Sequence, residues 1–480
     1  MHLKYGVAAL LLGSLFFGCH LGPKYVPPAV EAPAEWKGGS QQASPTPAVP
    51  IPCLDFWWEV FDDAPLNYLE QQAIENNPNL TVAIERVIQA RAMAGVKKAD
   101  LFPQITLNPL FSDTGELFQL QLPPGFDIPG VSAGKTVYRI HQFEYSLPLN
   151  LSYELDLWGK LRGQYQSARQ NAQSLEFAYY SSLLSLTSDV ASSYYQLRSL
   201  DAQIDLYQAT IEAFSGTYYT VKSRFDKGLT NYLDLLNATL QITNAQAGLE
   251  DLKRQRAQQE DALAVLIGAP ASTFSLEHNP LYSAPPSIPA GIPSAILSRR
   301  PDIAQAERSM ASEHALIGVA YASFLPSITL TEAFGFISPV IKKFLEAPSR
   351  YWLLGANAAQ SVSDGGRNVF NLEGTKAAYR ESVAAYQQSV LVAFREVEDA
   401  LNGLEMQYTQ STYLALSVET AEKGFELSLN RYKNGLTNYL DVMDSQRSQL
   451  AAKTSYTQLQ GVRFLSTIQL IKALGGGWEG

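Results

Sequence analysis

Apolar side chains recur every three or four residues along two long parts of the chain. Residues 149–269 and 349–480 contain no proline, although the whole sequence has 26. Proline removes a backbone donor and clashes with the preceding helical turn, so these exclusions predict long, uninterrupted helices. The first apolar stripe consists of Leu175, Tyr179, Leu183, Leu186, Val190, Tyr194 and Leu197. Its mean spacing is close to that of a helical turn, which predicts little supercoiling; a coiled-coil bundle fits the same pattern.

A period of two residues appears outside these helices. From residue 143 to residue 157, apolar and polar side chains alternate, which is typical of a strand with one apolar face. The segment exceeds the ~10 residues that a tilted membrane-spanning strand needs. Weaker alternation predicts one strand within 105–111 and two more within 328–336 and 351–362, although Glu332 interrupts the pattern.

The sequence contains an internal duplication, in which both the helical and the strand patterns occur twice. The heptapeptide Gly-Leu-Thr-Asn-Tyr-Leu-Asp occupies residues 228–234 and again 435–441, and similarity at this offset of 207 extends well beyond it. A second offset, of 223, aligns residues 77–106 with 300–329. We therefore predict a first structural repeat at 61–269 and a second at 300–480, joined by a proline-rich connector at 270–299. Such a duplication suits the wall of a tube better than an enzyme cleft.

The repeated heptapeptide has the chemistry of a tight turn between two helices. Gly228 and Gly435 suit a left-handed residue at a helix C-terminus. Asn231 with Asp234, and Asn438 with Asp441, have the spacing of an N-cap followed by an acidic third residue. A helix over residues 160–226 would be roughly 100 Å long at ~1.5 Å per residue, which is the span of a bacterial periplasm.

The N-terminus carries an export signal. Residues 1–18 have the outline of a signal peptide, and a small residue followed by Cys19 resembles a bacterial lipobox. This predicts an acylated Cys19, followed by a proline-rich leash over residues 19–60 that runs extended along a surface. Phe16 and Phe17 depart from the usual lipobox, so an ordinary signal peptide that contains a cysteine is the alternative.

Four predicted strands are too few to close a barrel, because even small barrels have about eight. An open sheet edge inside a bilayer leaves unpaired backbone groups that cost several kcal/mol each. The hairpins therefore either belong to a soluble sheet or share one barrel with other chains. The export signal and the long helices favour the shared barrel, to which three chains would contribute twelve strands.

Composition and motifs exclude several functions. The net charge is −10 and basic clusters are absent, which disfavours nucleic acid. After the N-terminus no apolar run reaches the ~18 residues of a membrane-spanning helix. His141, His278 and His314 are isolated, without metal-ligand spacing, and no nucleophile elbow or phosphate loop occurs. We therefore expect no enzyme activity, no metal and no cofactor.

Together these features resemble the TolC-like outer-membrane efflux channels, in particular their acylated NodT/OprM-type branch. The resemblance covers essentially the whole mature chain. Its motifs are Cys19 with Gly22-Pro23-Lys24-Tyr25, Arg300-Pro301-Asp302-Ile303, Tyr439-Leu440-Asp441 with Asp444-Ser445-Gln446-Arg447, and Ala473-Leu474-Gly475-Gly476-Gly477-Trp478. It implies a mainly α fold with a membrane β-barrel: a homotrimer whose twelve-stranded barrel in the outer membrane continues as a periplasmic α-helical barrel.

The resemblance also implies partners and a gate. Family members receive substrates from an inner-membrane pump through a periplasmic adaptor, and side chains near the helix turns hold the tunnel shut. The matching gate candidates here are Leu440, Asp441, Asp444 and Arg447. Each also has a structural explanation: Leu440 as a core residue, Asp441 as a cap, and the last two as an exposed pair worth about 0.5 kcal/mol. The first copy has Asn237 and Leu240 in place of that pair, so we expect the second turn to contribute more to closure.

The sequence thus predicts a lipid-anchored outer-membrane exit duct that passively conducts small toxic compounds or drugs. One alternative is the duct of a type I protein-secretion system; another is a periplasmic coiled-coil scaffold or adhesin without channel activity. The alternation at residues 143–157 argues against the scaffold. The cargo is not encoded in these patterns, because the pump and adaptor set it, and with only 5 methionines the chain gives no support for copper or silver export.

Overall fold

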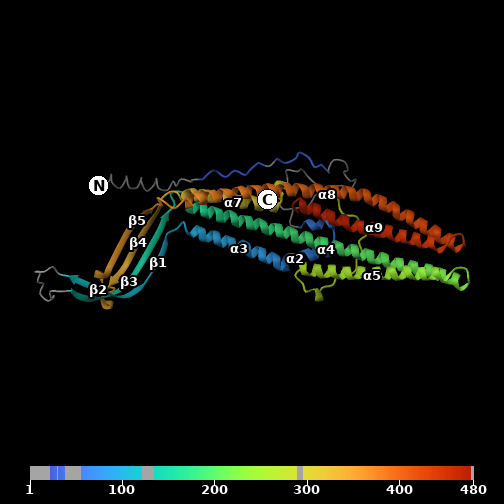
Figure 1. Ribbon diagram of the computed structural model, residues 1–480, viewed down its shortest axis with the longest axis horizontal. Helices are drawn as coiled ribbons and strands as arrows, with labels where there is room; N and C mark the ends of the chain where they lie inside the picture. The colour runs from blue at the N-terminus through green and yellow to red at the C-terminus, as the bar shows by residue number, and fades with distance from the viewer. Residues whose placement is uncertain (1–21, 30, 38–55, 122–134, 289–295, 477–480) are drawn as a thin grey trace. The chain divides into compact units, whose positions relative to one another are not determined.

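The computed structural model describes residues 22–29, 31–37, 56–121, 135–288 and 296–476 (Figure 1). The chain divides into two compact units. The first, which we call the strand unit, comprises residues 1–26, 89–172 and 310–382. The second, the hairpin unit, comprises residues 27–88, 173–309 and 383–480. Each unit takes segments from both halves of the sequence, so the units do not coincide with the sequence repeats.

The strand unit contains one antiparallel sheet. β3 pairs on one side with β1 and β2 and on the other with β4, which in turn pairs with β5. All the predicted strands are present, and that predicted within 105–111 is divided at Pro109, which cannot donate to the ladder. The strand bounds are β1 (Gln104–Leu107), β2 (Leu110–Gln121), β3 (Lys135–Leu155), β4 (Ser327–Ser338) and β5 (Arg350–Ala359).

The register gives this sheet one apolar and one polar face. One row across the strands consists of Leu107, Leu149, Phe334 and Trp352. A row on the opposite face consists of Gln104, Ser152, Thr331 and Gly355. Glu332, which interrupts the sequence pattern, lies on the apolar face between Leu151 and Leu354. Among the described strands, β5 pairs only with β4, so its outer edge is open, as is that of β1 and β2.

The helices predicted from the proline-free segments are confirmed. α4 (Lys160–Asp226) and α8 (Arg367–Lys433) have 67 residues each, and α5 (Tyr232–Leu266) and α9 (Tyr439–Ala473) have 35 each. A carboxylate caps the start of each long helix: Asp156 accepts from the N–H groups of Leu161 and Arg162, and Asp364 from those of Gly366 and Asn368. The other described α-helices are α2 (Ala64–Asn76), α3 (Pro78–Ala99), α6 (Ile296–Arg299) and α7 (Pro301–Ala322). The described 3₁₀ segments are η1 (Trp57–Phe61), η2 (Ala271–Thr273), η4 (Ile341–Lys343) and η5 (Ala347–Ser349).

The hairpin unit has an aromatic core in which η1 and α2 pack against α4 and α9. Its members include Trp57, Leu66, Tyr194 and Phe464. Glu70 of α2 is fully buried there, its carboxylate oxygens have no hydrogen-bond partner, and burial raises its pKa well above the ordinary value. The residues that anchor the leash also belong to this unit: Trp36 is buried edge-on against Phe394, and the backbone N–H of Lys37 donates to Glu398 at 2.7 Å.

None of the helices in the described part of the chain is long and apolar enough to cross a membrane. No cluster of three or more histidine, cysteine, aspartate or glutamate side chains within the described ranges is arranged to hold a metal ion.

Candidate functional site: the two helix tips

Each pair of long helices reverses direction at one copy of the heptapeptide. Gly228 and Gly435 have φ values of +72° and +75°, which a residue with a side chain adopts only under strain. The backbone N–H groups of Leu229 and Leu436 donate to the carbonyls of Arg224 and Arg431, at 2.8 and 2.9 Å. These contacts satisfy carbonyl groups that a helix end otherwise leaves open.

The next helix starts identically in both copies. The side-chain oxygen of Asn231 accepts from the backbone N–H of Asp234 at 2.9 Å, and Asn438 accepts from that of Asp441 at 3.1 Å. The carboxylates of these aspartates accept hydrogen bonds from the hydroxyls of Thr230 and Thr437. The turn predicted from the heptapeptide is confirmed, and Asp441 has a structural role in it.

The surroundings of the two tips differ. Tyr439 is 1% exposed, whereas its counterpart Tyr232 is 59% exposed. Tyr439 belongs to what we call the tip cluster, which unites the two hairpins and consists of Val221, Ala238, Tyr432, Tyr439, Val442 and Met443. Burial raises the pKa of Tyr439 to about 12, and the nearby Tyr432 and Asp234 act in the same direction. The second tip is therefore packed against the first, while Tyr232 at the start of α5 remains exposed.

Polar contacts flank the tip cluster. Arg224 donates through Nη1 to the carbonyl oxygen of Lys433 at 3.0 Å, and its guanidinium lies 4.8 Å from the ring centre of Tyr432. The buried side chain of Gln446 donates to Thr217 Oγ1 at 3.0 Å. These contacts could not be predicted from the sequence because each joins residues of different repeats; the alignment of Arg224 with Arg431 at the offset of 207 identifies a repeated arginine but not its partner.

The structure changes the account of the gate candidates. Among the described residues of the single chain, the side chains of Asp444 and Arg447 form no ion pair. Arg447 instead extends from α9 to the buried side chain of Gln241 on α5, with Nε 3.4 Å from the amide oxygen. With the oxygen and nitrogen of the Gln241 side-chain amide exchanged by a 180° rotation, the amide oxygen accepts from Arg447 Nε at 3.2 Å and from Arg447 Nη2 at 3.0 Å. The three-residue spacing of Asp444 and Arg447 could not indicate that Arg447 contacts Gln241 on the neighbouring helix.

Of the other predicted site residues, two are exposed and one lies outside the described part of the chain. Leu440 is 52% exposed and lies outside the tip cluster, so it is not a core residue of the turn in this chain. Asp444 is exposed as well. Cys19, the predicted acylation site, lies outside the described residues.

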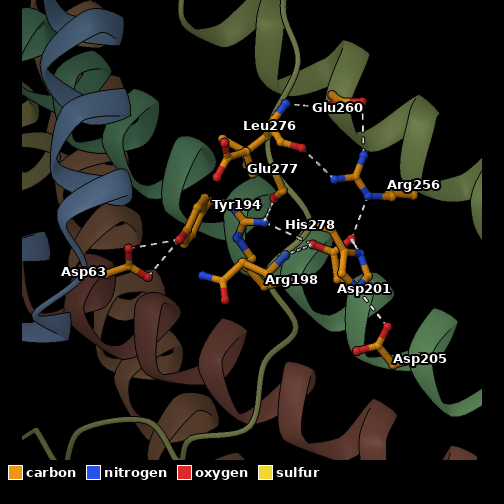
Figure 2. A network of polar contacts seen from close by, with 11 residues as sticks. Asp63, Tyr194, Arg198, Asp201, Asp205, Arg256, Glu260, Leu276, Glu277 and His278 are labelled. Atoms are coloured by element: carbon orange, nitrogen blue, oxygen red, sulfur yellow. Dashed lines mark hydrogen bonds and ion pairs between the residues drawn. The ribbon is translucent and has the colours of Figure 1, made fainter.

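A second polar centre in the hairpin unit fastens the connector to the helices (Figure 2). Asp201 of α4 is fully buried and accepts from Arg198 Nη1 at 3.0 Å, Arg256 Nε at 2.6 Å and the backbone N–H of Asn279 at 3.1 Å. His278, isolated in the sequence, lies with its ring nitrogens 3.1 and 2.8 Å from carboxylate oxygens of Asp201 and Asp205.

The same arginines also bind the connector backbone. Arg198 donates to the carbonyl of Glu277 at 2.6 Å, and Arg256 to that of Leu276 at 2.8 Å (Figure 2). The ionic groups are thus paired and hydrogen-bonded, as buried charges require. We call this set the connector clamp; it has the character of a structural joint, and none of its members forms a nucleophile–base pair.

Comparison with known proteins gave concordant results. A family model described as outer membrane efflux protein matches residues 69–269 and 292–476. The solvent efflux pump outer membrane protein SrpC of Pseudomonas putida is 31% identical, over 98% of this chain and 97% of that protein. The cation efflux system protein CusC of Escherichia coli is 30% identical over 96% of both chains. Among solved structures, the outer-membrane channel OprN has a TM-score of 0.86 at 27% identity, over 96% of this chain and 100% of that one.

Proposed function

Because the chain belongs to the outer membrane efflux protein family, we propose that it is the exit duct of a three-part efflux machine, fed by an inner-membrane pump through a periplasmic adaptor. The family and the relatives named as outer membrane efflux proteins establish the location and the efflux channel. One observation carries the duct: two helices of 67 residues, each turning back at a capped tip. At ~1.5 Å per residue each helix is about 100 Å long.

The assembly is a homotrimer. Each chain supplies four strand positions, in an antiparallel order with open edges on both sides. An open edge in a bilayer is costly, and closing it between chains removes that cost. Three copies give twelve strands. The apolar row with Leu107, Leu149, Phe334 and Trp352 would then face lipid, and the polar face would line the passage.

The duct passively conducts small toxic compounds that the pump delivers. The relatives' names refer to different cargoes, solvent for SrpC and cation for CusC. The chain is 31% and 30% identical to these two, which gives no reason to assign it either cargo. The pump and adaptor therefore determine what is exported.

Cys19 anchors the mature chain to the outer membrane through acyl chains. The support is the step from Gly18 to Cys19 directly after an apolar leader. Mass spectrometry of the mature N-terminus tests this. An acylated peptide that begins at Cys19 is expected, and an unmodified cysteine or cleavage elsewhere would contradict the anchor without affecting the channel.

The second tip contributes most of the closed gate. Arg447 holds α9 against Gln241 of α5, and three such contacts would surround the narrow end in a trimer. Leu240 occupies the equivalent position in the first copy and offers no donor. Leu440, exposed beside the same turn, supplies an apolar side chain to the constriction.

Two measurements test the function. Purified protein in a planar bilayer should give discrete conductance steps, and a periplasmic scaffold would give none. A strain without the gene should accumulate small toxic compounds, and the wild-type gene should restore export. Unchanged export of small compounds together with loss of a secreted protein would favour the duct of a type I secretion system instead.

A further inference from the structure

The connection between β4 and β5, residues 339–349, forms a compact element that we call the outer loop. It contains η4 and η5, and the hydroxyl of Ser349 donates to the backbone carbonyl of Lys343 at 2.8 Å. β3 and β5 run in the same direction and lead into α4 and α8, whereas β4 runs the opposite way. The outer loop therefore lies at the end of the sheet opposite to the starts of these long helices.

The outer loop is folded over the end of the apolar face. Phe336 lies on this face, two residues along β4 from Phe334, and the ring centre of Phe344 in the loop is 6.1 Å from that of Phe336. Arg350, the first residue of β5, pairs directly with Phe336 and so projects from the same face. Trp352 follows two residues later on that face and is 77% exposed.

The apolar face ends at the level of this loop. Tyr145 of β3 pairs with Ser338, the last residue of β4, and beyond this point β3 continues in contact with β2. On the same face of that extension, His141 Nδ1 and Asp113 Oδ1 lie 3.6 Å apart, and both side chains are exposed. A polar pair of this kind belongs in water rather than in hydrocarbon. The outer loop thus lies where the proposed membrane surface meets water.

The loop presents positive charge at this boundary. Lys342 and Lys343 of η4 and the neighbouring Arg350 are exposed, and none of them has an ion pair within the described ranges. Glu346 is the single acidic residue among residues 339–350. Three cations therefore accompany one carboxylate here, in a chain whose net charge is −10.

Cations at the opposite end of the sheet are neutralised within the chain. Lys160 Nζ lies 3.1 Å from a carboxylate oxygen of Glu154, and Arg162 Nε lies 2.9 Å from one of Asp156. The structure therefore provides carboxylates for these two side chains but none for the cations of the outer loop. Unneutralised cations beside an exposed apolar surface are typical of sites that bind anionic lipid headgroups.

We propose that the outer loop binds a phosphate-bearing lipid of the outer leaflet. Lys342, Lys343 and Arg350 donate to phosphate oxygens, for which the planar guanidinium is well suited. Ile341 and Leu345, 58% and 68% exposed, contact the apolar part of the same lipid, next to the apolar face. The inference rests on the proposed outer-membrane barrel. A free phosphate would use the cations but would leave these two apolar side chains in water.

Lipid titration of the full-length protein in mild detergent tests the site, with lipid A as the probe and native mass spectrometry as the measurement. Lys342→Gln with Lys343→Gln should weaken binding roughly tenfold at low salt. Lys342→Arg with Lys343→Arg should bind nearly as the wild type does. The matched control is Lys97→Gln with Lys98→Gln, which removes two adjacent cations from the last turn of α3 and should leave binding unchanged.

Further arms identify what the cations recognise. Lipid A without its phosphates should bind the wild type no better than the glutamine variant, and ~1 M salt should reduce the difference between these two proteins. Ile341→Ser with Leu345→Ser should weaken binding several-fold although every charge is retained. Displacement of lipid A by inorganic phosphate at equal concentration would reveal a simple anion site and overturn the lipid proposal. Equal losses from the glutamine variant and the α3 control would overturn it as well.

Conductance separates this site from the proposed function. The glutamine variant should form channels of wild-type conductance in a planar bilayer, because the loop lies at the end of the sheet opposite to the long helices. A conducting wild type that binds lipid A no better than the glutamine variant would overturn the lipid site and leave the exit duct standing. A wild type that neither conducts nor binds lipid A would overturn the barrel together with the site.

Discussion

The two helix tips share seven identical residues and nearly identical backbones, yet one is packed and the other is open. Gly228 and Gly435 adopt the same left-handed conformation, and Asn231 and Asn438 cap the next helix in the same way. Tyr232 and Tyr439 nevertheless lie at opposite extremes of exposure. The comparison shows that the heptapeptide determines the turn, whereas the neighbouring hairpin determines what the turn buries.

The largest expected difference between the tips comes from removing the tyrosine ring. Tyr439→Ala would leave a cavity in the tip cluster, which we expect to destabilise the second hairpin tip by about 3–5 kcal/mol. Tyr232→Ala removes an exposed ring and should cost less than about 1 kcal/mol within the subunit. Hydrogen exchange of the amides in the first turns of α5 and α9, in dissociated subunits, measures both. Equal acceleration at the two tips would contradict the comparison.

Local chemistry explains why much of this fold could be predicted. Proline exclusion predicted α4 over residues 160–226, and the structure has the same bounds. The turn followed from glycine and asparagine, whose effects on the backbone need no distant partner. Alternation predicted β3, although its true start at Lys135 lies in a stretch where the loop composition hid the strand.

Contacts between different helices could not be predicted from the sequence. Asp201 is joined to Arg256 and His278, which are 55 and 77 residues away, and no periodic signal connects them. Arg447 was paired in prediction with Asp444 because the two are three residues apart along one helix; in the structure it contacts the buried amide of Gln241 on α5, which spacing along α9 could not indicate. Identical copies are the extreme case, because no feature of the heptapeptide itself could distinguish Tyr232 from Tyr439.

Of the two tips, only the one with the buried Tyr439 should be destabilised by alkaline pH. The pKa of Tyr439 is about 12 in the folded chain, against ~10 when unfolded. Between pH 10 and pH 12 the Tyr439 hydroxyl is ionised in the unfolded chain but still protonated in the folded chain. Its contribution to the free energy of unfolding is therefore fully present below pH 10 and is lost as the pH rises toward 12. The loss has an upper limit of about 3 kcal/mol, because each pKa unit corresponds to ~1.4 kcal/mol.

Comparison of phenylalanine variants isolates this effect from that of other buried tyrosines. Tyr439→Phe should remove part of the destabilisation that the wild type shows between pH 10 and pH 12, measured as local opening of α9 by hydrogen exchange. Tyr232→Phe should follow the wild type throughout. Identical pH profiles for the two variants would mean that Tyr439 is as accessible to solvent as Tyr232.

The gate proposal predicts an intermediate effect that is again confined to the second copy. Arg447→Ala would leave the buried Gln241 oxygen without a donor, at about 1–3 kcal/mol per subunit, and would release α9 from α5. Single-channel conductance should rise, and large antibiotics such as vancomycin should enter cells. Leu240→Ala, the matched change in the first copy, should leave conductance near the wild-type value.

Asp444→Ala refines the same comparison. Because its carboxylate has no ion pair with Arg447, its loss should alter conductance much less than the loss of Arg447. A larger rise from Asp444→Ala than from Arg447→Ala would show that the gate depends on a charged pair formed only in the assembled trimer. No rise from either variant would reduce both residues to an exposed face. Loss of efflux alone would not support the gate, since adaptor binding at the tips could cause it.

The smallest effects should come from the caps, and here the two tips should agree. Asn231→Ala and Asn438→Ala each remove one hydrogen bond to an exposed backbone N–H, which costs about 1 kcal/mol. Since both caps depend on the same seven residues, we expect the losses to match within a few tenths of a kcal/mol. Asp or Ser at either position should restore the bond. Exchange of the Asp234 and Asp441 amides reports each cap directly. If Asn438→Ala proved several times more costly than Asn231→Ala, the tip cluster would depend on the cap for its packing, and the turn could no longer be treated as independent of what it buries.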